Sequence, residues 1–146
     1  MTTVSAELAT ALRRVEDSYY NAADHKNFAL IETVFAKDAL VTYHHGTPQE
    51  LTISGREAVI AQLVDVVGSF AASTHVLANF SVEMTPTGPR SITHAIANVV
   101  LGEKILVRGL RYTDEFTQED GAWKILRRWH EPMWQHQAAA MPPVLK

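Results

Sequence analysis

The sequence predicts an α+β domain in which three N-terminal helices enclose a pocket against a cone-shaped, curved antiparallel sheet. Two observations support this prediction. Apolar residues recur at helical spacing before Phe70, and apolar and polar residues alternate at period two after it. Helices followed by an antiparallel meander are typical of α+β domains. A strongly curved sheet of this length, wrapped around helices, is able to enclose a small pocket.

Composition narrows the classes of function. The 146 residues fit one domain, with 47% hydrophobic and 20% charged residues. A net charge of -3 argues against a nucleic-acid or anionic-membrane partner. The absence of cysteine excludes disulfides and thiol chemistry. No secretory leader and no apolar run of about 20 residues is visible, so a cytoplasmic location is expected.

The helices are predicted from apolar spacing. A first amphipathic helix is expected over about residues 4–24, where Leu8, Leu12 and Val15 share a face. A short second helix would follow Asn27 as N-cap and extend to Phe35. A third would open at residues 54–55 and carry an apolar stripe up to residue 67.

The strands are predicted from alternation and turn residues. A short strand is expected over residues 40–43, and longer ones over 75–84, 91–101, 105–116 and 123–130. Glu119-Asp120-Gly121 is a strong hairpin signal. The segment 135–146, rich in alanine and proline, is expected to form a loose C-terminal tail after a domain spanning 1–134.

Two strand histidines and one helix-terminal acid are candidates for catalysis. His75 begins the first long strand, and His94 lies inside the second on the same face as Asn98. The alternative for each histidine is a structural role at the edge of the core. Asp24 ends the first helix, one turn after Tyr20, and the helix dipole disfavours an acid there. Asp24 is therefore expected to have a local partner, unless it is simply an exposed carboxylate in a turn.

Further residues are candidates for oxyanion stabilisation or substrate binding. Tyr43 could donate a hydrogen bond to an oxyanion, or be an ordinary core aromatic residue. Tyr112 shares a face with Arg108, and Arg127 could bind a carboxylate while its neighbour Arg128 points to solvent. One of these two adjacent arginines is expected to be structural. The full set of expected substrate-binding residues is Asn79, Asn98, Tyr112 and Arg127.

The spacing of the remaining residues indicates neither a metal site nor a catalytic nucleophile. The other histidines, His44, His45, His130 and His136, do not form a metal-ligand motif. No phosphate-binding glycine loop and no nucleophile elbow is present. Neither a metal nor an organic cofactor is expected.

The chain resembles SnoaL-like domains of the nuclear transport factor two superfamily, which includes scytalone dehydratase, ketosteroid isomerase and polyketide cyclases. The resemblance covers about residues 5–132. Four segments carry it by their order and spacing: YNAADHKNF (20–28), THVLANF (74–80), GLRYTDEF (109–116) and GAWKILRR (121–128). The resemblance implies a cone-shaped fold with an internal cavity.

The resemblance also implies roles for individual residues. In dehydratases of the group, a tyrosine and an aspartate near the end of the first helix face a strand histidine, and Tyr20, Asp24 and His75 occupy those positions. His94 falls where scytalone dehydratase has a second histidine. The expected function is a cofactor-independent lyase or isomerase acting by His75–Asp24 acid–base chemistry on a hydrophobic polyketide-like or steroid-like molecule. Tyr20 or Tyr43, directly or through a water, would stabilise an enolate oxygen. His94 would then deliver a proton to a leaving hydroxyl group, or to the carbon in an isomerisation.

The same fold also serves proteins that are not enzymes, because fold does not determine function. The alternative expectation is a non-catalytic pocket for a small apolar ligand, or a structural subunit. An exposed sheet face usually needs cover. A homodimer or homotrimer is therefore expected, through an aromatic surface formed by Trp123, Trp129, Met133 and Trp134.

Overall fold

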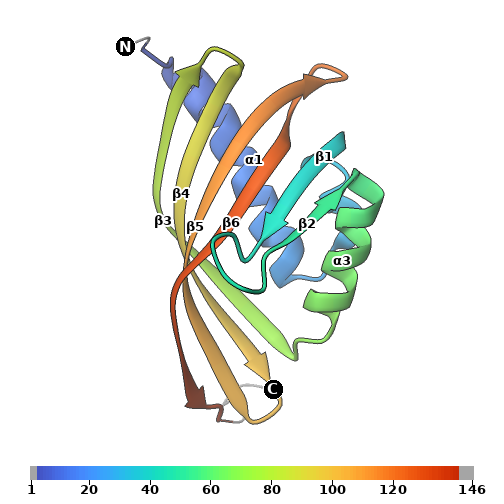
Figure 1. Ribbon diagram of the computed structural model, residues 1–146, viewed down its shortest axis with the longest axis vertical. Helices are drawn as coiled ribbons and strands as arrows, with labels where there is room; N and C mark the ends of the chain where they lie inside the picture. The colour runs from blue at the N-terminus through green and yellow to red at the C-terminus, as the bar shows by residue number, and fades with distance from the viewer. Residues whose placement is uncertain (1–2, 142–146) are drawn as a thin grey trace.

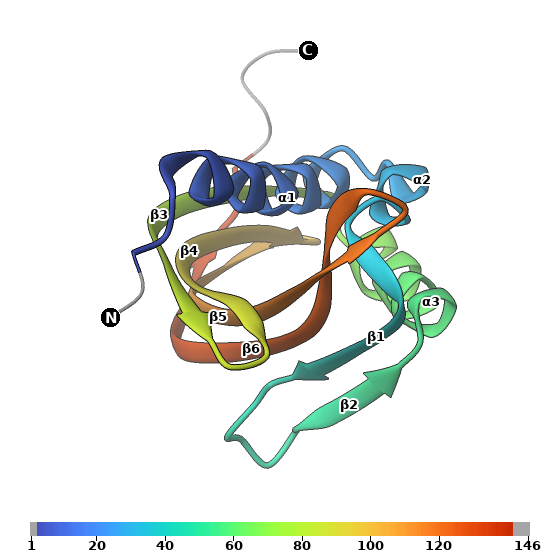
Figure 2. The same ribbon diagram turned by 90° about the horizontal axis from the view of Figure 1, so that it is seen from above.

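A computed structural model describes residues 3–141 as three helices and one sheet. Figure 1 shows long, bent strands beside a helical layer, and Figure 2 shows α1 lying across the concave face of the sheet. The α+β cone is therefore confirmed. The elements are α1 (Ala6–Asp24), α2 (Phe28–Ile31), β1 (Phe35–Tyr43), β2 (Leu51–Ser54), α3 (Arg56–Gly68), β3 (Ala72–Thr85), β4 (Gly88–Leu101), β5 (Lys104–Glu119) and β6 (Ala122–Ala139).

The helix ends follow local chemistry. Ser5 caps α1, because its hydroxyl accepts a hydrogen bond from the backbone N–H of Leu8 at 3.1 Å. Gly55 precedes α3 with a φ of 93°, a conformation that glycine adopts readily. The second helix is shorter than expected, because Phe35 begins β1 and pairs with Ile125 of β6.

The sheet has six strands in the order β2-β1-β6-β5-β4-β3. Strand β2, which the sequence analysis missed, forms an antiparallel pair with β1, whereas β1 runs parallel to β6. The other pairs are antiparallel. The β5–β6 hairpin turns on Asp120 (φ 54°) and Gly121 (φ 78°), as the sequence predicted, since a two-residue turn of this type needs positive φ at both positions.

The last strand is longer than expected. The sequence predicts a loose tail from residue 135, but Gln135–Ala139 continues β6 and pairs with Lys104–Arg108 of β5. The composition of this segment does not reveal a strand, because its pairing partner lies some 30 residues earlier in the chain. Residues 142–146 of the expected tail lie outside the described part.

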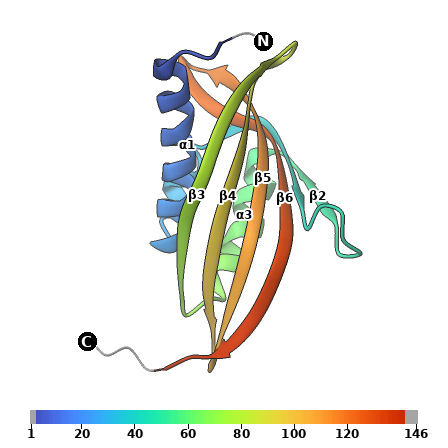
Figure 3. The same ribbon diagram turned by 90° about the vertical axis from the view of Figure 1, so that its left-hand side faces the viewer.

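Register shifts bend the long strands. They occur in β3 between Leu77 and Phe80, and in the β5–β6 ladder at Gly109/Leu110 and Glu115/Phe116. Such bulges increase local twist and reverse which face a side chain takes. Figure 3 shows the resulting curvature, with α1 on the concave side of the strands.

A buried ion cluster joins α1 to the sheet. The Arg128 guanidinium donates to Asp114 at 2.7 and 2.8 Å and to Glu16 at 2.7 Å, and all three side chains are almost fully buried. Burial raises the pKa of Glu16 well above its usual range, Arg128 opposes this rise, and Asp114 adds to it. The expectation that Arg128 is the solvated arginine was wrong. Arg128 is in the core, and Arg127 is exposed.

Candidate active site

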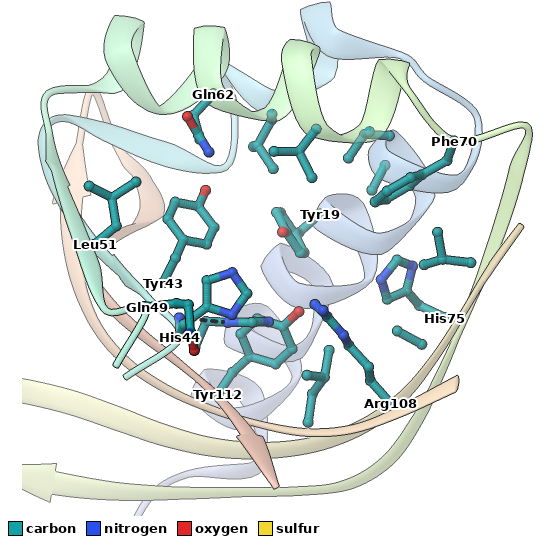
Figure 4. Close-up of a pocket in the computed structure, with 18 residues that line it drawn as sticks. Tyr19, Tyr43, His44, Gln49, Leu51, Gln62, Phe70, His75, Arg108 and Tyr112 are labelled. Carbon is teal, nitrogen blue, oxygen red and sulfur yellow. Dashed lines mark hydrogen bonds between the residues drawn. The ribbon is translucent and has the colours of Figure 1, made fainter. Parts of the chain in front are cut away.

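The concave face of the sheet, α1 and α3 enclose a cavity of about 170 Å³ (Figure 4). Leu51 and Val66, at 47% and 42% exposure, place its opening between β2 and α3. The wall is mostly apolar and aromatic. Its lining residues are Tyr19, Ala23, Tyr43, His44, Gln49, Leu51, Gln62, Leu63, Val66, Val67, Phe70, His75, Ala97, Val99, Arg108, Leu110, Tyr112 and His130.

His75 and Asp24 form a hydrogen-bonded pair at the inner end of this cavity. The Nδ1 atom of His75 lies 2.6 Å from Oδ1 of Asp24, and the two side chains are 10% and 19% exposed. Alternation along β3 turns Ser73 and His75 inward. A carboxylate can only accept here, so Nδ1 carries the proton and Nε2 keeps a free lone pair. The pair can therefore act as a base.

Asp24 is held as a carboxylate by three donors. Besides the imidazole, the backbone N–H of His75 donates to Oδ2 at 2.8 Å and the Ser73 hydroxyl donates to Oδ1 at 2.8 Å. Burial works to raise the pKa of Asp24, but the hydrogen bonds and charge of His75, with the bond from Ser73, outweigh it and lower the pKa. The unfavourable placement of an acid at the end of α1 is thus compensated by β3.

Tyr20 lies beside the imidazole and is not among the residues that line the cavity. Its ring centroid is 5.3 Å from that of His75, and its hydroxyl is buried without a hydrogen-bond partner among the described residues. Burial raises the pKa of Tyr20 well above its usual range, so it stays protonated. The direct oxyanion role expected for Tyr20 does not fit this position. Its neighbour Tyr19 lines the cavity instead.

Neutral hydrogen-bond donors line the wall contributed by β1 and β6. Burial raises the pKa of Tyr43, so its phenol remains a donor. The backbone N–H of His44 donates to Nδ1 of His130 at 3.2 Å, which leaves the proton of a neutral His130 ring on Nε2. Burial, followed by the charges of His44, Arg108 and Arg128, lowers the pKa of His130 to about 3. This imidazole is therefore neutral at pH 7 and able to donate.

Comparison with known proteins identifies the family. The SnoaL-like domain family matches residues 4–129. The chain belongs to the SnoaL-like domain family. A mycobacterial relative, the uncharacterized protein Rv2910c of Mycobacterium tuberculosis, is 32% identical over 114 residues, which cover 75% of each chain.

Solved structures show the same SnoaL-like fold. A candidate scytalone dehydratase from Novosphingobium aromaticivorans superposes with a TM-score of 0.75 at 21% identity, over 94% of this chain and 93% of that one. Hexachlorocyclohexane dehydrochlorinase LinA-type3 from Novosphingobium barchaimii superposes with a TM-score of 0.77 at 18% identity, over 92% of this chain and 94% of that one. At these identities the likeness establishes the fold.

Besides Tyr20, four further residues predicted to be functional lie outside the cavity of this SnoaL-like domain. His94 is exposed on the convex face, because the neighbouring Thr93 and Ala95 take the inward positions. Asn98 is on the same outer side, where its amide contacts the Thr74 carbonyl at 3.5 Å. Asn79 is exposed within the β3 bulge, and Arg127 is exposed over the ring of Trp129. Alternation along β4 correctly placed His94 and Asn98 on one face of the strand, and the structure shows that this is the convex face of the sheet.

The structure adds cavity residues that sequence reasoning missed. His44, His130 and Tyr19 line the cavity, and Arg108 does so from β5. For Arg108 a signal existed, since it shares the face of Tyr112. No signal pointed to His130, because a bulge separates it from the buried Ile125 and reverses the alternation.

The described residues contain neither a cluster of metal-ligand side chains nor a membrane-spanning helix. No group of three or more His, Asp or Glu side chains in residues 3–141 is placed to hold a metal ion. No helix within the described part is long and apolar enough to cross a membrane.

Proposed function

We propose that this protein is a cofactor-independent lyase or isomerase that removes a proton from a carbon of a small, mainly apolar molecule. The single observation that carries the proposal is the 2.6 Å contact between His75 and Asp24, with the imidazole lining a largely apolar cavity. A histidine oriented by a carboxylate and shielded from water is a common general base. In the alternative, a non-catalytic pocket, this pairing would serve only to hold the end of α1 against β3.

The reaction would proceed in two steps. Nε2 of His75 takes the proton from a carbon next to a carbonyl. The electron pair of the broken C–H bond forms a C=C bond, and the π pair of the carbonyl moves onto its oxygen. Tyr43 or His130 donates a hydrogen bond to that oxygen. The carbonyl then re-forms, and the electron pair of the enolate either expels a leaving group from the adjacent carbon, as in a lyase, or takes the proton back from His75 at a conjugated carbon, as in an isomerase. In the elimination, a chloride leaves as the anion, whereas a hydroxyl group takes the proton from the His75 imidazolium and leaves as water.

The size of the cavity favours a substrate of about one ring. A cavity of about 150 Å³ holds benzene in another protein, and the volume here is about 170 Å³. A four-ring steroid would need the opening between β2 and α3 to widen. The names of the two structural neighbours, a dehydratase and a dehydrochlorinase, both denote eliminations, which supports the lyase branch.

Proton exchange tests the proposal without knowledge of the natural substrate. We expect the protein in D₂O to catalyse deuterium incorporation next to the carbonyl of one-ring ketones, or loss of a β-hydroxyl or β-chloro group from them, followed by NMR. The control is the same ketone without protein. Ketones that bind without exchange or elimination across such a panel would instead support the non-catalytic pocket.

We also propose that the convex face of the sheet mediates assembly of two or three copies of this chain. Exposed apolar side chains form one row across β3, β4 and β6, because Val76 pairs with Ile96, Ile96 with Gly109 and Gly109 with Trp134. The indole of Trp134 lies against Gly109, where any β-carbon would collide with it. Rows of exposed apolar residues on a sheet often mark an interface.

Light scattering at micromolar concentration tests this assembly. The mass of the wild type is expected at two or three times the 16.2 kDa of one chain, and Trp134→Glu is expected to lower it to the mass of a single chain. Val64→Glu, at an exposed apolar position on α3, is the matched control and should leave the mass unchanged. A wild-type monomer under these conditions would rule the interface out.

A further inference from the structure

Arg108 differs from other partly or fully buried arginines of the described chain in that it has no carboxylate partner. The guanidinium of Arg56 is paired with Glu119, that of Arg111 with Glu131, and that of Arg128 with two carboxylates. Within residues 3–141, Arg108 has no carboxylate partner, and its one side-chain hydrogen bond runs from Nε to Oε1 of Gln135 at 3.1 Å. Figure 4 shows its guanidinium extending into the cavity, between Tyr112 and His75.

The surroundings of Arg108 leave its charge uncompensated. It is the single permanently charged residue among the described residues that line the cavity, and none of them is acidic. Asp24, behind His75, is already engaged by three hydrogen bonds. Burial lowers the pKa of Arg108, and burial followed by the charge of Arg108 lowers the pKa of His44. A partly desolvated cation without a counter-ion is costly unless a ligand supplies the opposite charge.

The position of Arg108 relative to His75 is set by strand register. Both residues pair with Ala97 of β4, one from each side, so they lie two strands apart on the concave face. Two strand spacings separate their backbones by roughly 10 Å. The small side chain of Ala97 leaves space between them, and that space is part of the cavity.

We propose that Arg108 binds a carboxylate group of the substrate, so that the cavity accepts a one-ring organic acid whose reactive carbon lies at His75. The placement of the reactive carbon at His75 rests on the proposed function. The binding of a carboxylate by Arg108 rests only on the geometry of the cavity. An arginine fork matches the two oxygens of a carboxylate, and it would fix which carbon of the ring faces the base.

Binding of simple probes tests the proposal without turnover. Titration calorimetry at pH 7.5 would compare benzoate and cyclohexanecarboxylate with benzamide, a neutral molecule of nearly the same shape. We expect the wild-type protein to bind the carboxylates roughly 10- to 100-fold more tightly, the range for hydrogen bonds to a charged group. Arg108→Gln should abolish this preference, and Arg108→Lys should retain part of it.

Control variants separate this proposal from the proposed reaction. Arg127→Gln removes an exposed arginine outside the cavity and should leave the preference unchanged. His75→Ala should still prefer benzoate, because the anion site lies on the other side of Ala97. Equal binding of benzoate and benzamide by the wild type would overturn the carboxylate site, as would a preference that survives in Arg108→Gln with unchanged near-UV circular dichroism. Neither outcome would bear on His75, whose test is proton exchange.

Discussion

Replacement of His75 by alanine is expected to lower turnover by about 10²–10⁴-fold, the usual contribution of a positioned acid–base group. Of the His75–Asp24 pair, only His75 lines the cavity. Its loss therefore removes the group that receives the proton. The fold should survive, because the backbone N–H of residue 75 and the Ser73 hydroxyl still donate to Asp24. Rates of deuterium exchange or elimination on the most reactive ketone measure the effect.

His94→Ala is the matched control for this experiment. It removes a histidine one strand away, on the convex face, and should retain wild-type turnover. Asp24→Asn should lose much of the activity without losing the imidazole, because an amide does not hold the Nδ1 proton and orientation as a carboxylate does. If His75→Ala keeps full activity, the base has been assigned to the wrong residue.

Replacement of Arg128 by methionine is expected to destabilise the protein by about 3–5 kcal/mol, the range for breaking a buried ion pair from one side. The substitution would leave Glu16 and Asp114, both fully buried, without the cation that each now contacts at 2.7 Å. It would also remove the guanidinium that lies 4.3 Å from the ring centroid of Tyr19. Chemical denaturation at pH 7 measures the loss.

Two further variants test the physical reason for this loss. Arg127→Met changes the adjacent exposed arginine and should alter the free energy of unfolding by no more than about 0.5 kcal/mol. Replacing all three members, as Arg128→Met, Asp114→Leu and Glu16→Leu, should recover much of the stability, because no unpaired charge then remains buried. A cost below about 1 kcal/mol for Arg128→Met alone would show that the cluster is not a dry ion pair.

Much of the architecture could be predicted from local pattern. Helical spacing predicted α1 and α3, period-two alternation predicted β3 to β6, and turn residues placed the hairpin at Asp120-Gly121. The cost of an acid at a helix C-terminus indicated only that Asp24 has a local partner, and the family resemblance indicated that this partner is His75. The helices, the alternating strands and the hairpin depend on side chains close in sequence, whereas the contact between Asp24 and His75 joins residues 51 positions apart.

The tertiary structure decided which face of each strand points inward. Alternation groups His94 with Asn98 and separates Arg127 from Arg128, but it cannot say which group faces the cavity. In β6 the bulge near Leu126 places Ile125 and then Arg128 inward, three residues apart. In β3 a bulge exposes Asn79 in the same way. One extra residue in a strand reverses every side chain beyond it, and long-range pairing determines where that residue is accommodated.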